Sequence, residues 1–229
     1  MKLFKTSLVA ASLATAAALA TPVSAQVQGN IATVNAPGVI INTTAFQTAY
    51  QQIGTTYKSQ LDTIRQRSEE RQTLLKQLDT NNDNELDEAE QTAAQNSSQA
   101  QRIAQIEQEV GQLSNQVDSA RIYAIEQILR QYSPALQEVV TQRQIQFVVA
   151  PEAVVYAPQQ ANITQLVATS LNAKVPSVQI VPPQGWQPNR NSVAMFQQIQ
   201  QALLTAQAIQ AQQQQQAAQQ QNPQAPTGR

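Results

Sequence analysis

The chain has 229 residues, with 14 basic and 15 acidic side chains, a formal net charge of −1 and neither cysteine nor histidine. Without these two residue types, disulfides, zinc–thiolate sites, thiol nucleophiles and histidine-based catalytic triads are excluded. Aromatic residues make up 4% of the chain and charged residues 13%, whereas Gln and Ala recur almost throughout. This composition predicts long helices and an elongated shape rather than one thick core, and we do not expect an enzyme.

The N-terminus has the pattern of a secretory signal peptide over residues 1–25. Lys2 and Lys5 precede an apolar run, and a small-residue cleavage signal ends at Ala25. We predict cleavage after Ala25, so that the mature chain lies outside the cytoplasm. The apolar run is too short to span a bilayer and no other stretch approaches the required length, so we expect no transmembrane segment in the mature chain. Loss of Lys2 and Lys5 leaves 12 basic against 15 acidic residues, a net charge of −3, which argues against nucleic-acid binding.

Short strands are predicted on both sides of a long helical region, because β-branched and aromatic residues alternate or gather there. The candidate strands are residues 30–36, 145–150 and 153–156. Pro37-Gly38 breaks the chain after the first of them, and residues 39–42 extend the strand or form a turn. Thr43 or Thr44 then caps a helix.

Two long helices fill the middle of the chain. The first runs from about residue 44 to 78, with a weak point at Gly54, and the second returns from about 87 to 143, where Pro134 predicts a kink or a break. In the second helix apolar residues alternate steps of three and four, which is a heptad seam: Ile103, Ile106, Val110, Leu113, Val117 and Ala120. We predict that the two helices pair as an antiparallel coiled coil, an arm with an acidic turn at its far end.

Beyond the strands the chain contains a short helix and a tail. Asn162 caps the short helix, residues 163–173. A Pro-rich segment follows, in which Trp186 either docks on the body, docks on a partner or lies exposed. A second helical pattern then fades into a Gln-rich tract, and residues 210–229 are predicted to be disordered or weakly helical.

The acidic turn at residues 79–90 has the spacing of an EF-hand calcium loop. Its oxygen ligands fall at positions one, three, five, seven, nine and twelve: Asp79, Asn81, Asp83, the backbone carbonyl of Glu85, Asp87 and the bidentate Glu90. Position six is Asn84, where EF-hands carry glycine, and the chain has no second such loop. Two interpretations stay open: a calcium site at the tip of the arm, or a solvated acidic turn whose carboxylates favour the start of the second helix.

An exported chain, a strand that ends in VN, a long helical hairpin and the segments IQFVVAPEAVVYA and ITQLVATSLN occur in this order over residues 30–175. This layout resembles the Skp/OmpH-like family of periplasmic chaperones. The resemblance implies a homotrimer with a small β-barrel body and three helical arms around a cavity. It also implies a periplasmic holdase that binds unfolded outer-membrane proteins without ATP and requires no cofactor.

The predicted fold is mainly α, with a long helical hairpin on a small β body. Its parts are the signal peptide 1–25, the β body with its short helix 26–43 and 144–175, the arm 44–143, the linker 176–191 and the Gln/Ala-rich tail 192–229.

The arm departs from the resembled family in its charge. Members often have basic arms, whereas residues 57–143 contain nine basic and 14 acidic side chains. Electrostatic capture of acidic clients is therefore not expected from the arm. An alternative function is a calcium-stiffened coiled coil that bridges components of the cell envelope.

Overall fold

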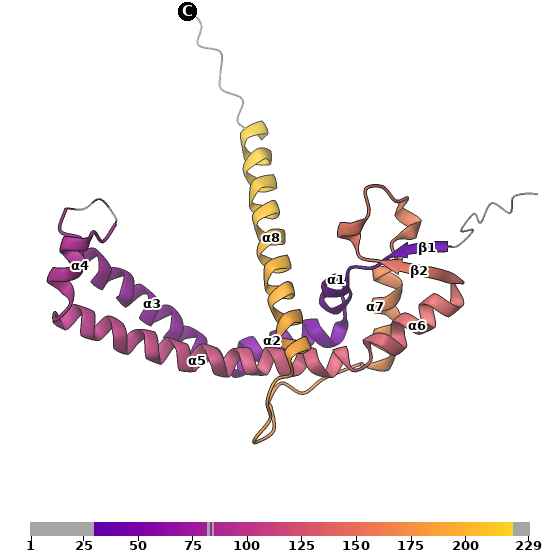
Figure 1. Cartoon of the computed structure of the whole chain (residues 1–229), viewed down its shortest axis with the longest axis horizontal. Helices are drawn as coiled ribbons and strands as arrows, with labels where there is room; N and C mark the ends of the chain where they lie inside the picture. The colour runs from indigo at the N-terminus through magenta and orange to yellow at the C-terminus, as the bar shows by residue number, and fades with distance from the viewer. Residues whose placement is uncertain (1–29, 82, 84, 222–229) are drawn as a thin grey trace, which may run out of the picture.

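The computed structural model describes residues 30–81, 83 and 85–221, with the backbone alone for residues 218–221. The predicted signal peptide and the last part of the tail, residues 222–229, lie outside the described residues. The described chain is mainly helical with one small sheet, which confirms the predicted fold class (Figure 1). Its elements are β1 (Asn30–Thr33), α1 (Ala36–Ile41), α2 (Thr44–Thr56), α3 (Lys58–Leu78), α4 (Glu88–Ala94), α5 (Ser98–Leu129), α6 (Tyr132–Gln142), β2 (Ile145–Val149), α7 (Thr164–Lys174) and α8 (Arg190–Gln221), with short 3-10 turns at Pro151–Ala153 and Gln159–Ala161.

The sheet joins the two ends of the arm. Strands β1 and β2 pair in parallel, with Ile31 opposite Phe147 and Thr33 opposite Val149. Parallel strands need a long crossover connection, and here the whole arm is that crossover. The chain enters β2 through Gln144, whose φ of 52° lies in the left-handed region and turns the backbone out of α6. The predicted pairing between the strands on either side of the arm is therefore confirmed.

One apolar core packs the helices around the sheet. It draws on α1, α2, α5, α6, α7 and α8, and its largest fully buried side chains include Ile40, Ile125, Ile128, Leu171 and Ile199. Each such side chain contributes about 1.5–3 kcal/mol when it is removed from water. We call the part of the molecule that holds this core the body.

A second, smaller core lies where the arm leaves the body. Ile53 of α2 packs there against Val117 and Ala120 of α5, with the half-buried Tyr57 and Leu61 beside them. We call this group the arm-root cluster. Beyond it α3 and α5 continue side by side to α4 at the far end, and the arm projects away from the body (Figure 1).

The predicted strand at residues 153–156 is wrong. The chain forms a 3-10 turn at Pro151–Ala153. After this turn Val155 is fully exposed and Tyr156 is largely exposed. The valines favour a strand, but Pro151 starts the turn, and among the described residues the sheet contains only β1 and β2.

The predicted break at Pro37-Gly38 is also wrong, since these residues lie inside α1. Asn35 caps this helix by accepting a hydrogen bond from the Gly38 N–H at 2.8 Å. Pro37 falls in the first turn, where its missing N–H costs nothing. Val39 and Ile40 are buried, so the apolar run packs as a helix rather than extending the strand.

The two long helices are shorter than predicted. The first is interrupted at Tyr57 rather than at Gly54, and its start is capped by Thr43, which accepts from the Phe46 N–H. The second is divided at residues 95–97 and again at 130–131. Pro134 therefore sits in the first turn of α6, where a proline is tolerated.

The tail is more ordered than predicted. Helix α8 begins at Arg190 and continues to Gln221, through much of the segment expected to be disordered or weakly helical. Its first turns pack on α5 and α1, with Phe196 and Ile199 in the body core. The predicted apolar stripe is thus real, and it attaches the tail to the body.

Candidate functional site

Ion pairs join α3 to α5 in the middle of the arm, where Ile106 of α5 is also buried. Helix α3 has no buried residue. Three charge pairs join it to α5: Arg67 with Glu109 at 2.7 Å, Glu70 with Arg102 at 2.7 Å and Arg71 with Glu107 at 3.1 Å.

Glu70 lies at the centre of this network, because Arg67 also reaches it at 2.9 Å. The pKa of Glu70 is lowered, chiefly by the hydrogen bond that Arg102 donates and also by Arg67. The hydrogen bond with Glu70 also raises the pKa of Arg102. These side chains are about one-third exposed, so the network is open to solvent and sensitive to salt.

The apolar seam of the arm is thin and partly exposed. Along α5, Ile106, Val117 and Ala120 are buried, as the heptad pattern predicts. The remaining seam positions on both helices are only half-buried: Ile103, Val110, Leu113, Leu61, Ile64, Leu74 and Leu75. The arm therefore presents small apolar patches between polar and charged side chains along its length.

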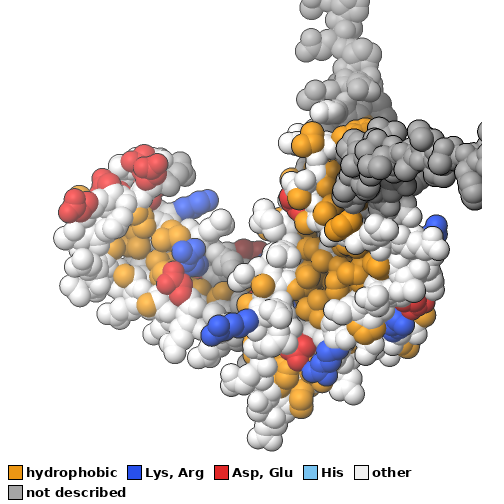
Figure 2. All heavy atoms as spheres, turned by 45° about the vertical axis from the view of Figure 1, so that its right-hand side comes forward, with side chains coloured by type: hydrophobic (Ala, Val, Ile, Leu, Met, Phe, Trp, Pro, Cys, Tyr) orange, Lys and Arg blue, Asp and Glu red, His pale blue; other side chains and the backbone are white. Residues whose placement is uncertain are grey.

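The tip loop is closed by hydrogen bonds between its own side chains and backbone. Asp79 ends α3 as its C-cap, and Asp87 caps α4 by accepting from the Glu90 N–H at 2.8 Å. Between them, Asn81 accepts from the Asp83 N–H at 2.9 Å, and Asp83 accepts from the Glu85 N–H at 2.8 Å. Figure 2 shows the acidic side chains gathered at this end of the arm.

Glu90 is the one buried acid of the tip. One of its carboxylate oxygens accepts from the Thr80 N–H at 2.7 Å, the Thr80 hydroxyl at 2.8 Å and the Asn81 N–H at 3.1 Å. The other oxygen accepts from the Asp87 N–H at 3.3 Å, which completes a capping box. These bonds, above all that from the Thr80 hydroxyl, lower the pKa of Glu90. The resulting stabilisation is fully present above the unfolded pKa of Glu90 and is lost as the pH falls through its lower folded value.

The six predicted calcium ligands all lie in this loop. In the part of the chain that the structure describes, no three His, Cys, Asp or Glu side chains gather closely enough to hold a metal ion. Asn82 and Asn84, which belong to the loop, lie outside the described residues. Glu90 folds back to the start of the loop, whereas Asp83 and Glu85 are exposed. Calcium binding stays a prediction.

The body carries exposed apolar side chains of its own. Ile31 and Phe147, which face each other across β1 and β2, are 54% and 50% exposed. Val155, Tyr156 and Leu166 are exposed as well. Figure 2 shows a broad hydrophobic area on the body near the foot of α8.

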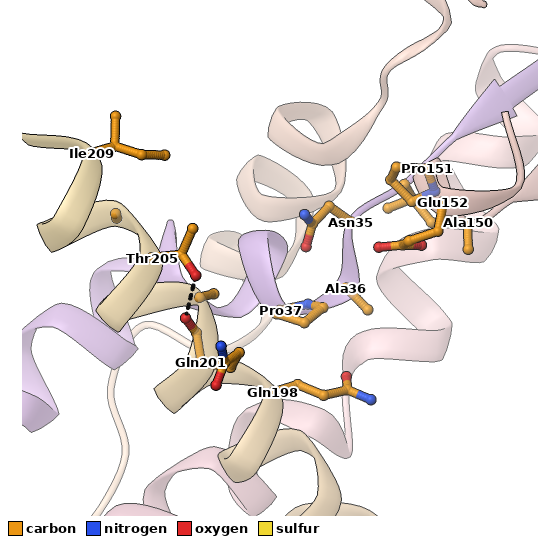
Figure 3. Close-up of a pocket in the computed structure, with 13 residues that line it drawn as sticks. Asn35, Ala36, Pro37, Ala150, Pro151, Glu152, Gln198, Gln201, Thr205 and Ile209 are labelled. Carbon is orange, nitrogen blue, oxygen red and sulfur yellow. Dashed lines mark hydrogen bonds between the residues drawn. The ribbon is translucent and has the colours of Figure 1, made fainter. Parts of the chain in front are cut away.

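An open groove separates α8 from the body, with a volume of about 750 Å³ (Figure 3). One wall is formed by small and polar residues of α8 together with Ile209, and the other by the start of α1 and the turn after β2. The residues labelled on these walls include Gln198, Thr205 and Ile209 on one side and Pro37 and Pro151 on the other.

Sequence reasoning missed the groove and left the position of Trp186 open. The stripe Val193–Leu203 signals an amphipathic helix, but a periodic pattern does not say which surface the helix covers. Trp186 packs on the body core with its ring edge-on to Tyr123, at a centroid distance of 5.3 Å. Of the alternatives for Trp186, the structure places it on the body.

No helix among the described residues is both long enough and apolar enough to cross a membrane. A family model described as "Outer membrane protein (OmpH-like)" matches residues 30–171. The chain belongs to the OmpH-like family. The match covers β1, the arm, β2 and α7 as far as Leu171, and it confirms the resemblance carried by these segments. In this OmpH-like protein the linker and α8 lie beyond the matched region.

The chain is also similar to a crystal structure from Caulobacter crescentus CB15, described as a candidate OmpH-like outer membrane chaperone. The two are 15% identical, and the similarity covers 68% of this chain and 91% of the other, with a TM-score of 0.38. Among curated proteins no match is found.

Proposed function

We propose that this OmpH-like protein is a periplasmic holdase. It binds unfolded outer-membrane proteins during their passage through the periplasm and prevents their aggregation, without nucleotide and without a required cofactor. The family match over residues 30–171, which includes the whole arm, is the observation that carries this proposal.

The surface of the arm supports the proposal. An unfolded outer-membrane strand offers alternating apolar side chains and unpaired backbone groups. Half-buried residues such as Leu61, Ile64 and Leu113 offer weak apolar contacts, and the Gln-rich sides offer hydrogen bonds. Many weak contacts suit clients of varied sequence. Because the arm is net acidic, this binding depends on apolar and hydrogen-bonded contacts rather than on attraction of acidic clients.

A homotrimer is part of the proposal. A two-stranded sheet is marginal alone, and its outer edges have unpaired N–H and C=O groups that another chain can pair with. Exposed Ile31, Phe147 and Tyr156 lie on or after these strands, and an interface between copies would cover them. Three arms on such a body would surround a shared client.

A second candidate function is a calcium-stiffened coiled coil that bridges envelope components. The helix boundaries favour it: α3 ends directly before the first position of the EF-hand pattern, and Asp87 at the ninth position caps the second helix. The two candidates differ in what happens to an unfolded client.

The decisive experiment dilutes a urea-unfolded β-barrel outer-membrane protein into buffer and follows light scattering. We expect the mature protein, without nucleotide, to suppress aggregation at near-stoichiometric amounts, whereas an equal amount of a folded, unrelated protein does not. If the client aggregates equally with and without the mature protein, the holdase proposal is wrong. The calcium-stiffened coiled coil is then the better supported of the two candidate functions.

A further inference from the structure

We propose that residues 175–199 form a strap that fixes the root of the arm to the body and leaves only the outer part of the arm free to bend. This segment lies beyond the family match. The inference concerns the mobility of the arm, and it stands whether or not the protein is a holdase.

The strap contacts both apolar clusters. Its first residue, Val175, and the following Val178 pack on the body core. Ile180, two residues further on, packs instead on the arm-root cluster around Ile53 and Val117. A single short segment therefore ties the body to the base of the arm, and it runs along α5 to the foot of α8 (Figure 1).

A reciprocal pair of hydrogen bonds fastens the strap to α5 between these contacts. The Gln127 side-chain amide donates to the Gln179 carbonyl at 2.8 Å, and the Gln179 N–H donates back to the Gln127 side-chain oxygen at 3.0 Å. The bonds fix the backbone of an otherwise irregular segment. Pro176, Pro182 and Pro183 restrict the same segment, which lowers the entropy lost when it is pinned.

The far end of the strap is anchored by the first turns of α8. Asn189 caps the helix by accepting from the Ser192 N–H at 2.8 Å. The buried Ser192 hydroxyl lies 3.5 Å from a carboxylate oxygen of Glu126. The other carboxylate oxygen of Glu126 forms an ion pair with the Arg130 guanidinium at 2.8 Å. Phe196 and Ile199 then enter the body core. Since both ends are buried, the strap cannot slide along α5 without opening the core.

The outer arm has no comparable restraint. Helix α3 begins at Lys58, its N-cap Tyr57 makes no side-chain capping hydrogen bond, and none of the residues of α3 is buried. It contacts α5 through solvent-exposed charge pairs and a thin seam. Bending is therefore expected beyond Tyr57 and not at the junction of α2 with the body.

Distance measurements between spin labels test the strap. The chain has no cysteine, so labels can be placed at Gln72→Cys on the exposed side of α3 and Gln165→Cys on α7. The labelled mature protein is mixed with excess unlabelled protein, so that each distance arises within one chain. The test variant is Gln127→Ala with Ile180→Ala, and the matched control is Gln116→Ala, an exposed glutamine of the same helix. We expect a broader distance distribution in the test variant only, and equal widths in all proteins would overturn the proposal.

Hydrogen exchange gives a second readout at the root itself. Gln127→Ala alone removes the two hydrogen bonds with Gln179 and the one that Gln127 donates to the Tyr123 carbonyl, but no packed apolar group. This readout therefore does not depend on the folding of the double variant. Amides of α2 and of residues 117–128 should exchange about fivefold faster, as the loss of an ordinary hydrogen bond predicts. Acceleration confined to the outer arm, or none, would contradict the strap. Because neither readout uses a client, failure of the holdase proposal would leave both results unchanged.

Discussion

Glu90 organises the tip of the arm through bonds to both ends of the acidic loop. It accepts from Thr80 and Asn81 at the start and from Asp87 at the end. A carboxylate in this position satisfies N–H groups that would otherwise be left open at the start of α4. The same carboxylate is the twelfth-position ligand of the EF-hand pattern, so calcium binding would require it to exchange amide donors for the metal.

Calcium titration calorimetry decides between the two interpretations of this loop. If the loop is a calcium site, the wild-type mature protein releases or absorbs heat on titration, and Glu90→Ala abolishes the response because the bidentate ligand is lost. Glu88→Ala is the control, since this exposed neighbour is not at a ligand position. The same response in the wild type and in Glu90→Ala would identify the loop as a solvated acidic turn.

At the residue scale, the sequence predicts helix-capping residues but not the hydrogen bonds between residues far apart in the chain. Of the two predicted caps Thr43 and Thr44, Thr43 caps α2, because a cap depends on residues two or three positions away. Asn162 accepts from the Thr164 N–H, but the N-cap of α7 is Ile163, which makes no side-chain capping bond. The pairing of Gln127 with Gln179, and of Ser192 with Glu126, joins positions far apart in the chain. Glutamine is so frequent here that nothing in the sequence distinguishes Gln127 from its exposed neighbours.

The N-terminal part of helix α8 is packed on the body, whereas side chains further along the helix are exposed. Its first turns bury Phe196 and Ile199 in the body core, whereas Leu204 and Ile209 further along are 59% and 50% exposed. An isolated helix of modest length is marginal in water, so the buried half stabilises the exposed one.

A pair of substitutions on α8 tests this division. Ile199→Ala should lower the free energy of unfolding by about 2–5 kcal/mol, because it opens a cavity at a fully buried site. Ile209→Ala, the same change on the exposed half, should stay within about 0.5 kcal/mol of wild type. Urea unfolding followed by circular dichroism measures both. Equal, small effects would show that α8 does not belong to the body core.

The outer arm depends on charge pairs that solvent reaches. Raising the salt from about 0.1 M to about 1 M shortens the Debye length from about 10 Å to about 3 Å, so these pairs should weaken. We expect faster hydrogen exchange in α3 at high salt, and Glu70→Gln should reproduce this effect at low salt.

The exposed Glu69, which makes no ion pair among the described residues, provides the control as Glu69→Gln. Exchange in α3 that is independent of salt, or equal in the two variants, would contradict the role of the charge network.

At the element scale, periodic patterns identified the helices but not their ends. The heptad residues Ile106 and Val117 are buried as predicted, because spacing alone determines which face of a helix is apolar. The interruption at Arg130–Gln131 lies four residues before Pro134, which has no N–H to donate to the Arg130 carbonyl, so the predicted break at this proline is confirmed. The interruption at Tyr57 has no proline or glycine at the break, and the sequence did not predict it. For Val155 and Tyr156 the predicted element itself was wrong. Their residue types favour a strand, but a strand needs a partner that the described sheet does not provide.

The whole molecule is a small body from which one long crossover extends. Because β1 and β2 pair only after the arm has returned, body and arm form together. The strap then adds a further attachment at the root of the arm. The sheet and the turn after it carry exposed apolar residues. In a single chain this apolar surface faces solvent, and an interface between copies would cover it.

Size-exclusion chromatography with light scattering tests the proposed function most directly. The mature protein is measured alone and after mixing with a urea-unfolded β-barrel outer-membrane protein, without nucleotide. The account predicts three times the mass of the mature chain alone, and a soluble complex of that trimer with one client after mixing. A monomer that leaves the client to aggregate would contradict it.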